Sequence, residues 1–503
     1  MPALRYFHPP AVFSGLMPSK ASHRALTLAL LTGLLLGFVA TPRAAEAAET
    51  RIWVDPARGD DSAAATRSRP IETLAEAWQR ARVRRTGRTV IALRAGDYSD
   101  SSPGYWEYPD PYGAPAAPIL IDSVDGRGKA VLPSVTLFRV RDVEFRRVKL
   151  RSPGLGGDLL QCERCNGLTL RRITALGSNN QETVKVNQSS RVTITGSVLR
   201  NAGDNVIDLV AVRRARIRNN RISDGGDWCA YAKGGSSDVV VTGNLFTRCG
   251  TGGFTAGQGT GFQFMVAPWL HYEAVGVVVR GNTVTDTDGA AFGVNGGFNV
   301  LIERNVARNV GSRSHVLEAV YGGRSCDGTP GDPGRERCGQ YLSAGGWGTT
   351  VVDDGTNGVL IPNRNVYFIG NVIDSPANPN DGLHQTLTVF GPLAPQPGSG
   401  VPNGGSGDSG LVFERNWIRN GPANMPLGIG DGTGCSGSHP TCSPSRVTGS
   451  NRIGRVAPLI RRAKNGRLTA RGKTLAYVRR GSARQPSWAS LPAGSPPWAR
   501  WPR

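Results

Sequence analysis

The sequence lacks long apolar runs, helices between its predicted strands, and cysteine or glycine motifs for common cofactors. After residue 40, no apolar stretch approaches the roughly 20 residues that a transmembrane helix needs, so nothing downstream is expected to cross a bilayer. Cys162 and Cys165 have no second CxxC and no suitably spaced histidine pair, which argues against zinc. The glycine-rich stretch 250–259 has no following P-loop lysine, which argues against nucleotide binding.

A repeat of 23 to 25 residues runs through 141–305 and then resumes further along the chain. Short apolar strands recur at Phe145, Leu170, Ile194, Ile217 and Val241, spaced 25, 24, 23 and 24 residues apart. The later members of the series are Val279, Ile302, Phe368 and Phe413. Three positions after the later anchors lies an asparagine, namely Asn220, Asn244, Asn282, Asn305, Asn371 and Asn416.

This period is typical of a leucine-rich repeat or of a parallel β-helix, both of which stack units around a shared core. The LxxLxL signature of leucine-rich repeats is absent, and the strands alternate β-branched residues before a turn-forming Gly or Asn. Asparagines at one place in successive coils would stack about 4.8 Å apart and bond to one another. We therefore predict an all-β, right-handed parallel β-helix with an internal asparagine ladder.

The repeat resembles the pectate-lyase-type right-handed β-helix superfamily over roughly residues 50–425. The N-terminal stretches "RIWVDPARGDD", "RPIETLAEAWQRA" and "TVIALRAGDY" resemble the strand, capping helix and first coil that open many such proteins. Ile71, Leu74, Ala75 and Trp78 fall on one helical face suited to plugging the open end of a solenoid. We expect the cap and first coils at 48–140 and the β-helix at 141–425.

Residues 1–47 have the pattern of a secretory signal peptide. Lys20 and Arg24 precede the apolar stretch 25–40, and Ala45-Glu46-Ala47 supplies small residues before a cleavage site. An uncleaved anchor is the alternative. We expect the mature protein to be secreted, extracellular or periplasmic, with no membrane span after cleavage.

The sequence contains eight cysteines, and we expect them to form disulfides. An even number of cysteines in an oxidising compartment favours such pairing. Three pairs are close in sequence, and the fourth pair is twenty residues apart, about one coil. The pairs are Cys162 with Cys165, Cys326 with Cys338, Cys435 with Cys442, and Cys229 with Cys249. We predict that Cys229 and Cys249 are joined, because one turn returns the chain to about 4.8 Å from its start.

The excess positive charge is concentrated at the C-terminus. The chain carries a net charge of +21, and 13 Lys or Arg with no Asp or Glu lie in 452–503. We therefore interpret 426–503 as a basic, Pro/Gly-rich tail without the coil pattern. Its expected partner is an acidic polysaccharide or cell-surface glycan and not nucleic acid, although a tail that is merely solvated is the alternative.

Candidate catalytic residues follow from aligning successive coils. Lys185 lies nine residues before its anchor, Asp208 nine before the next and Lys233 eight before the one after, so the three would occupy neighbouring rungs. The spacing of eight instead of nine residues would point the Lys233 side chain inward. A bulge at Gly234-Gly235 would absorb this one-residue difference and keep the side chain on the outer face. Glu182, Asp204 and Asp227 would add carboxylates to the same face. An ordinary solvated surface is the alternative.

A second resemblance concerns the same stretch. "GDNVIDLV" followed one coil later by "AYAKGGS" is similar to the calcium-and-lysine arrangement of one group of β-helix pectate lyases. Only Asp204, Asp208 and Lys233 correspond, and Asp204-Asn205 replaces the paired aspartates of that group. The resemblance implies Lys233 as the base and possible calcium at Asp204 and Asp208. The alignment of coils, and not the resemblance, adds Lys185 on an adjacent rung as a second catalytic candidate.

Two long interruptions of the repeat offer further candidates. The first contains Trp269, His271 and Glu273, which we predict to bind substrate together with Asp208, although its aromatic residues would equally cover the neighbouring coil. The second contains His315 with Glu318, an alternative acid/base pair.

These patterns favour a monomeric protein that cleaves a uronate polysaccharide by β-elimination, with no cofactor other than possible calcium. Two alternatives stay open. One is a non-catalytic carbohydrate-binding or adhesion protein, and the other is a structural solenoid of the cell envelope.

Overall fold

The computed structural model describes residues 49–480 except 115, 153, 155, 178–180, 328–332, 352–357, 390–395, 403–409 and 430–442. The expected signal peptide at 1–47, the pair Cys435 and Cys442, and residues 481–503 therefore lie outside the described residues. Within the described part of the chain, no helix is long and apolar enough to cross a membrane.

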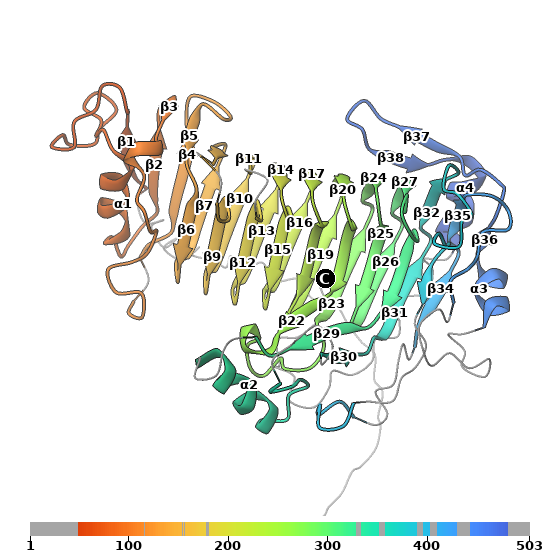
Figure 1. Cartoon of the computed structure of the whole chain (residues 1–503). Helices are drawn as coiled ribbons and strands as arrows, with labels where there is room; N and C mark the ends of the chain where they lie inside the picture. The colour runs from red at the N-terminus through yellow and green to blue at the C-terminus, as the bar shows by residue number, and fades with distance from the viewer. Residues whose placement is uncertain are drawn as a thin grey trace, which may run out of the picture. The chain divides into compact units, whose positions relative to one another are not determined.

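Three long parallel sheets, which we call A, B and C, form the body of the protein, and most coils contribute one strand to each (Figure 1). Sheet A consists of β1 (Thr50–Val54), β2 (Thr89–Leu93), β4 (Ile119–Ser123), β7 (Arg141–Arg146), β10 (Asn166–Arg171), β13 (Ser190–Thr195), β16 (Arg213–Arg218), β19 (Ser236–Thr242), β23 (Ala274–Arg280), β26 (Gly297–Glu303), β31 (Arg364–Ile369) and β34 (Val412–Glu414). Sheet B consists of β3 (Gly96–Asp97), β5 (Ala130–Leu132), β8 (Lys149–Arg151), β11 (Thr174–Leu176), β14 (Val198–Ala202), β17 (Arg221–Gly225), β20 (Leu245–Cys249), β24 (Thr283–Thr287), β27 (Val306–Val310), β32 (Val372–Ser375), β35 (Trp417–Asn420) and β36 (Arg452–Ile453). Sheet C consists of β6 (Val135–Phe138), β9 (Leu160–Glu163), β12 (Val184–Asn187), β15 (Ile207–Val210), β18 (Trp228–Lys233), β21 (Gly252–Gly257), β25 (Ala290–Asn295), β28 (Leu317–Val320) and β33 (Thr388–Val389).

The register of sheet A confirms the predicted repeat. Phe145 aligns with Leu170, Leu170 with Ile194, Ile194 with Ile217, and Ile217 with Val241, and all five side chains are buried. Because strand side chains alternate between two faces, each anchor points into the core and stacks on the next. A continuous apolar column along the stacked coils is the result.

The predicted asparagine ladder is present and buried. It starts at Ser197 and runs through Asn220, Asn244, Asn282, Asn305, Asn371, Asn416 and Asn451. From Ser197 to Asn416, each backbone N–H donates to the side-chain oxygen of the next coil at 2.9–3.1 Å. From Asn220 to Asn416, each asparagine Nδ2 donates to that same oxygen and to a carbonyl of the preceding coil, as Asn220 does to Ile194. The ladder therefore pairs polar groups that a bare turn would bury without partners.

Replacing Asn282 with alanine should lower the free energy of unfolding by about 1–3 kcal/mol, because it leaves buried donors without an acceptor. The backbone N–H and Nδ2 of Asn244 both donate to the Asn282 oxygen. Urea unfolding followed by circular dichroism would measure the change. Asn380→Ala, at an exposed asparagine, is the control, and equal effects of the two variants would contradict a structural role for the ladder.

The N-terminal end is closed by α1 (Leu74–Arg82), as predicted. Its N-cap Thr73 accepts a hydrogen bond from the backbone N–H of Glu76 at 3.1 Å. Leu74, Ala77, Trp78 and Ala81 face the core, whereas the predicted Ala75 is only partly buried. The buried face therefore contains Ala77 in place of the predicted Ala75 and extends to Ala81. The centres of the Trp78 and Trp106 rings lie 5.0 Å apart, and both side chains are fully buried.

The interpretation of 426–503 as a single tail needs correction for 443–480. Asn451 continues the ladder and β36 continues sheet B, so the stack extends beyond residue 425. The chain then forms a module with these elements: α3 (Pro444–Ser450), the antiparallel hairpin β37 (Ile460–Arg462) with β38 (Leu468–Ala470), and α4 (Gly472–Arg480). Trp417, Leu468 and Val478 pack together in one apolar cluster, so the module is anchored on the last coils. The sequence did not predict this packing, because the module lacks the 23- to 25-residue period of the coils.

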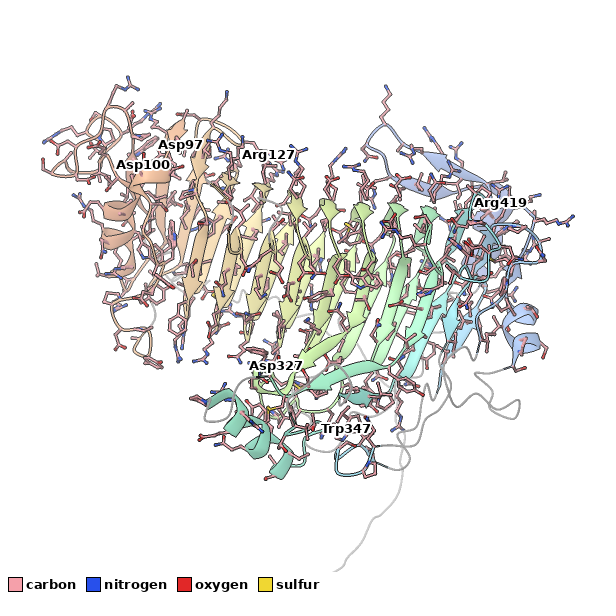
Figure 2. The ribbon with its side chains drawn as sticks, viewed as in Figure 1. Asp97, Asp100, Arg127, Asp327, Trp347 and Arg419 are labelled. Carbon is pink, nitrogen blue, oxygen red and sulfur yellow. A yellow bond between two sulfur atoms is a disulfide. The ribbon has the colours of Figure 1, made fainter. Side chains whose placement is uncertain are left out.

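The two interruptions of the repeat meet in one excursion beside the stack, where Figure 2 places Asp327 and Trp347. The first interruption supplies β22 (Gly259–Gly261) and the 3-10 helix η2 (Phe262–Phe264). The second supplies β29 (Gly322–Ser325), α2 (Pro333–Ser343) and β30 (Val359–Ile361). β29 pairs with β22 and with β30, so one small sheet joins the two interruptions. A second 3-10 helix, η1 (Ser99–Ser101), lies near the N-terminus.

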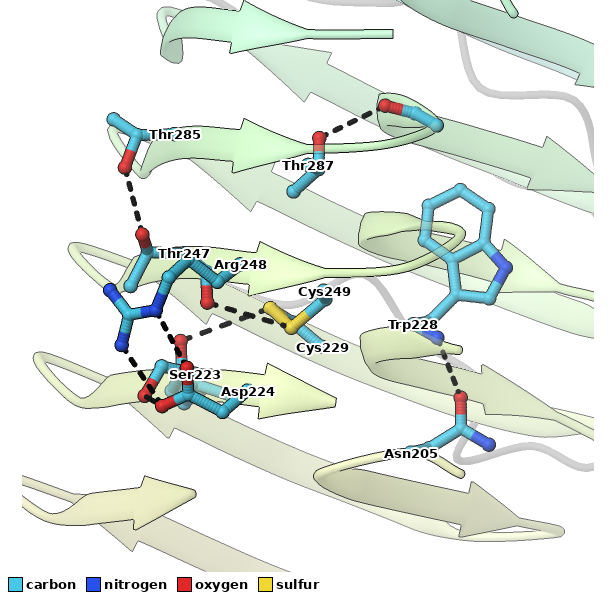
Figure 3. Close-up of a disulfide and its surroundings, with 12 residues drawn as sticks. Asn205, Ser223, Asp224, Trp228, Cys229, Thr247, Arg248, Cys249, Thr285 and Thr287 are labelled. Carbon is cyan, nitrogen blue, oxygen red and sulfur yellow. Dashed lines mark hydrogen bonds and ion pairs between the residues drawn. A yellow bond between two sulfur atoms is a disulfide. The ribbon is translucent and has the colours of Figure 1, made fainter. Parts of the chain in front are cut away.

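Three disulfides occur in the described residues and confirm the expected pairing there. Cys229 and Cys249 are joined across one coil with their Cα atoms 5.4 Å apart (Figure 3). The other two link Cys162 with Cys165 and Cys326 with Cys338. The last of these ties α2 to the segment after β29, which fixes the excursion.

Candidate functional site

A row of outward-facing positions crosses sheet C and carries the predicted charged residues. Lys185 on β12 aligns with Asp208 on β15, as the sequence predicts. Asp208 aligns with Tyr231 on β18, whereas Lys233 aligns with Val210. Lys233 therefore lies two residues further along its strand than predicted, and the period of two keeps it on the outer face. Tyr231 takes the position that the sequence analysis gave to Lys233.

Lys185 is held by carboxylates on two coils. Its ammonium group lies 3.0 Å from Glu182 and 3.4 Å from Asp208. Burial would lower the pKa of Lys185, but the negative charges of Asp208 and Glu182 outweigh it and raise the pKa above its ordinary value. Lys185 is thus a fixed cation.

Lys233 occupies a different environment. Its ammonium group donates a hydrogen bond to Gln258 Oε1 at 3.2 Å and lies 4.4 Å from the centre of the Tyr231 ring. Gln258 in turn donates to Asp227 at 3.1 Å, so this predicted carboxylate acts on Lys233 only through an amide. Gly234 and Gly235 follow with φ of 63° and 83°, a left-handed conformation that turns the chain sharply after the lysine.

A groove of about 420 Å³ joins these groups to the excursion. Sheet C contributes Lys185, Asp208, Tyr231 and Lys233, and the turns before its strands contribute Glu182 and Asp204. The facing wall comes from the excursion, with lining residues Gly259, Thr260, Gly261, Phe264, Gly323, Arg324, Ser325 and Asp327. The two interruptions therefore build a wall over the charged row, which no coil of the regular repeat provides.

Glu273 does not reach this groove, although we predicted that it binds substrate. It is fully buried and accepts hydrogen bonds from Arg324 Nε at 2.9 Å, from the Thr260 hydroxyl at 2.6 Å and from the Gly234 N–H at 3.0 Å. The remaining donors of Arg324 reach the carbonyls of Trp347 and His271. Glu273 is therefore positioned to support the groove, because it joins the turn after Lys233 to the excursion wall.

Trp269 and His271 also lie away from the groove. Trp269 is 5% exposed and packs in an apolar cluster with Tyr272, Phe298 and Trp347. It lines a separate cavity of about 190 Å³, and Gly235 is among the other lining residues. The His271 ring contacts the Trp347 ring at an interplanar angle of 47°, and its Nε2 lies 3.2 Å from the Gly345 carbonyl oxygen. Burial lowers the pKa of His271. The structure thus favours the alternative interpretation, in which these aromatic residues cover the neighbouring coil.

His315 forms the predicted pair with Glu318, with 2.7 Å between Nε2 and the carboxylate. Glu318 lies on β28, three strands beyond Tyr231 in the same outward row. At about 4.8 Å per strand, this separation is roughly 14 Å. The structure therefore does not bring His315 together with Lys233.

Burial dominates the acid–base properties of Asp208. It raises the pKa of Asp208 to about 7, against the opposing attraction of Lys233 and Lys185. The folded protein therefore holds a proton there that the unfolded chain releases above about pH 4. Tyr231 is buried beside Asp208 and Glu182, and burial together with these carboxylates raises its pKa as well. Its phenol keeps its proton at neutral pH.

Asp208→Asn should become more stabilising, relative to wild type, as the pH rises from about 4 to about 7. Over this range the unfolded wild type releases the Asp208 proton whereas the folded protein retains it, so ionisation favours unfolding, and the amide has no proton to lose. Urea unfolding at several pH values would give the difference in free energy between the two proteins. A difference that does not change with pH would contradict the raised pKa.

The carboxylates do not fit the calcium site that the resemblance implies. Asp208 is buried and paired with Lys185, while Asp204 accepts a hydrogen bond from Asn205 at 2.8 Å. Among the described residues, no group of three or more His, Cys, Asp or Glu side chains is arranged to hold a metal ion. Calcium prefers six to eight oxygen ligands. We therefore assign no catalytic step to calcium.

Sequence reasoning missed Tyr231, Gln258, Arg324 and Asp327. Tyr231 could have been predicted from the sequence, because it lies two residues before Lys233 and therefore on the same face of the strand. Gln258, Arg324 and Asp327 come from the irregular segments, where no period fixes which residues face one another.

Comparisons with known proteins agree with this architecture. Residues 158–316 match a family model described as "Right handed beta helix region". No curated protein sequence matches the chain. Similar solved structures include a GH136 lacto-N-biosidase from Eubacterium ramulus, with 9% identity and a TM-score of 0.49 over 81% of this chain and 68% of that one.

Two further structures are similar at a lower level. A PL6 family polysaccharide lyase from Pseudopedobacter saltans has 11% identity and a TM-score of 0.43, covering 80% of this chain and 91% of that one. PfbA, a surface adhesin of Streptococcus pneumoniae, has 10% identity and a TM-score of 0.41, covering 77% and 82%. The parallel sheets and the family match together identify the fold as a right-handed parallel β-helix.

Proposed function

We propose that this protein is an exported enzyme that cleaves an acidic polysaccharide by β-elimination in the groove over sheet C. The observation that carries the proposal is the pairing of a fixed cation, Lys185, with a second lysine, Lys233, beside a protonated phenol in one groove. Three disulfides in the described residues support export, because such bonds persist in oxidising compartments.

The proposed reaction assigns each group one role. Lys233, in its neutral form, removes the proton from the carbon next to the sugar carboxylate. The electron pair forms a carbon–carbon double bond, the glycosidic C–O bond breaks, and Tyr231 donates a proton to the leaving oxygen. Lys185 provides positive charge opposite the carboxylate as negative charge develops on it.

Gln258 positions Lys233 for this reaction. The hydrogen bond from the Lys233 side chain to Gln258 Oε1 at 3.2 Å fixes the direction of the lysine in the groove.

Hydrolysis by the carboxylates is the second candidate. Burial raises the pKa of Asp208 to about 7, whereas the pKa of Glu182 is lowered by Asp158 and Lys185 despite its own burial. Two carboxyl groups with separated pKa values are the usual arrangement for a general acid and its ionised partner.

One assay separates the candidates. The purified protein is mixed with polyuronates, and ultraviolet absorbance of the unsaturated product is recorded together with new reducing ends. Elimination produces both signals, whereas hydrolysis produces reducing ends alone. The absence of both signals despite measurable binding would favour the non-catalytic alternative.

A further inference from the structure

The C-terminal module carries a concentrated positive charge on a folded surface. Residues 452–480 contain ten Lys or Arg and no Asp or Glu. All of these except Arg467 are exposed. Because β36 to β38 and α4 are folded elements, these cations are held in fixed relative positions, unlike those of a flexible tail.

Several cations of the module have no acidic partner within the described part of the chain. Some arginines of the coils, in contrast, pair across rungs, as Arg248 does with Asp224 and Arg171 with Glu144. Within the described residues, six cations of the module form no ion pair, namely Arg455, Arg461, Arg462, Lys464, Arg471 and Lys473. Unpaired like charges repel one another, so this arrangement favours an anionic partner.

A cavity of about 520 Å³ lies between the module and the turns that join sheets A and B. Val306, Val372, Leu468 and Val478 give it an aliphatic lining, and Arg304, Arg467 and Arg479 are cationic. Two contacts fix the module over these turns. Arg467 donates to the Gly281 carbonyl at 3.1 Å, and the Leu468 N–H donates to the Thr283 hydroxyl at 2.9 Å.

We propose that this cavity and the surrounding cations form a second binding site, for an anionic polysaccharide. An aliphatic surface suits the C–H face of a sugar ring, and arginine suits a carboxylate or sulfate group. The volume falls within the usual range of about 300–1,000 Å³ for a small-molecule site. Further exposed cations on the hairpin and on α4 would bind the neighbouring charged sugars of the same chain.

The site is separate from the groove over sheet C, with which it shares no lining residue. The proposal therefore does not depend on catalysis by Lys233. Exposed Val456 and Leu459 beside these cations would also suit an anionic bilayer. The concave, arginine-lined cavity favours a sugar chain instead, because a bilayer surface would leave the cavity unfilled.

The test uses the full chain on immobilised polygalacturonate over a range of salt concentrations. The triple variant Arg461→Gln/Arg462→Gln/Lys464→Gln should bind about tenfold more weakly or worse, with a shallower salt dependence. The matched control Arg69→Gln/Arg84→Gln/Arg85→Gln removes the same charge near the N-terminal end and should bind as wild type. Lys233→Ala should also stay bound, which separates this site from the groove.

Thr469→Trp tests the cavity without changing the charge. Thr469 is exposed and lines the cavity, so the indole should obstruct it and weaken binding severalfold at an unchanged melting temperature. Wild-type affinity in Thr469→Trp or in the module triple variant would overturn the proposal, as would equal loss in the matched control. Binding to vesicles of anionic lipid without retention on polygalacturonate would overturn the choice of partner.

Discussion

Lys233→Ala is expected to lower kcat/KM on a cleavable polyuronate by about 10²–10⁴, the contribution typical of a positioned general base. The side chain is partly buried at the outer end of β18, so its removal leaves no cavity in the core. Circular dichroism and the unfolding midpoint should therefore stay at their wild-type values while the rate falls.

Two further variants separate proton transfer from positive charge. Lys233→Arg keeps the cation but is always protonated, so it should lose kcat while KM changes little. Lys129→Ala removes an exposed lysine from the turn between β4 and β5 and should keep full activity. If Lys233→Ala retains a rate within about tenfold of wild type, Lys233 is not the base, and His315 becomes the next residue to test.

The stacked coils could be predicted from the sequence because two independent patterns agree on the register. Apolar anchors such as Ile217 and Val241 set which face is buried, and the asparagines three residues later, Asn220 and Asn244, fix the turn. A slip by one residue would expose the anchors and break the ladder at the same time. The pairing of Cys229 with Cys249 follows from this register as well.

The candidate site could be predicted only where it lies on regular strands. Lys185 and Asp208 align as expected because their coils have nearly equal lengths. Lys233 lies two positions from its predicted place, beside Val210 instead of Asp208. The turn at Gly234-Gly235 contains an extra residue, and the spacing to the anchor Val241 does not show where in the coil that residue is inserted. The excursion wall had no period at all, so Arg324 and Asp327 could not be assigned to the groove.

The wall depends on one buried ion pair, between Arg324 and Glu273, both of which have side chains with no exposed surface. Arg324→Met should lower the free energy of unfolding by about 3–5 kcal/mol, because it leaves the Glu273 carboxylate buried without its countercharge. Urea unfolding measures this change. Arg248→Met is the matched control, since Arg248 makes a similar two-bonded pair with Asp224 at the surface, and its loss should cost at most about 1 kcal/mol.

The same pair should couple stability to activity. Glu273 also holds the N–H of Gly234, the residue directly after Lys233, so loss of its charge should loosen the proposed base as well as the wall. Glu273→Gln should therefore lower activity even at temperatures where the variant is fully folded. In the double variant Arg324→Met/Glu273→Gln, no charge is left buried alone, so the loss of stability should be clearly smaller than the sum of the two single losses. Strictly additive losses of stability would show that Arg324 and Glu273 act independently, and unchanged activity of the folded Glu273→Gln variant would show that Glu273 has no part in positioning Lys233.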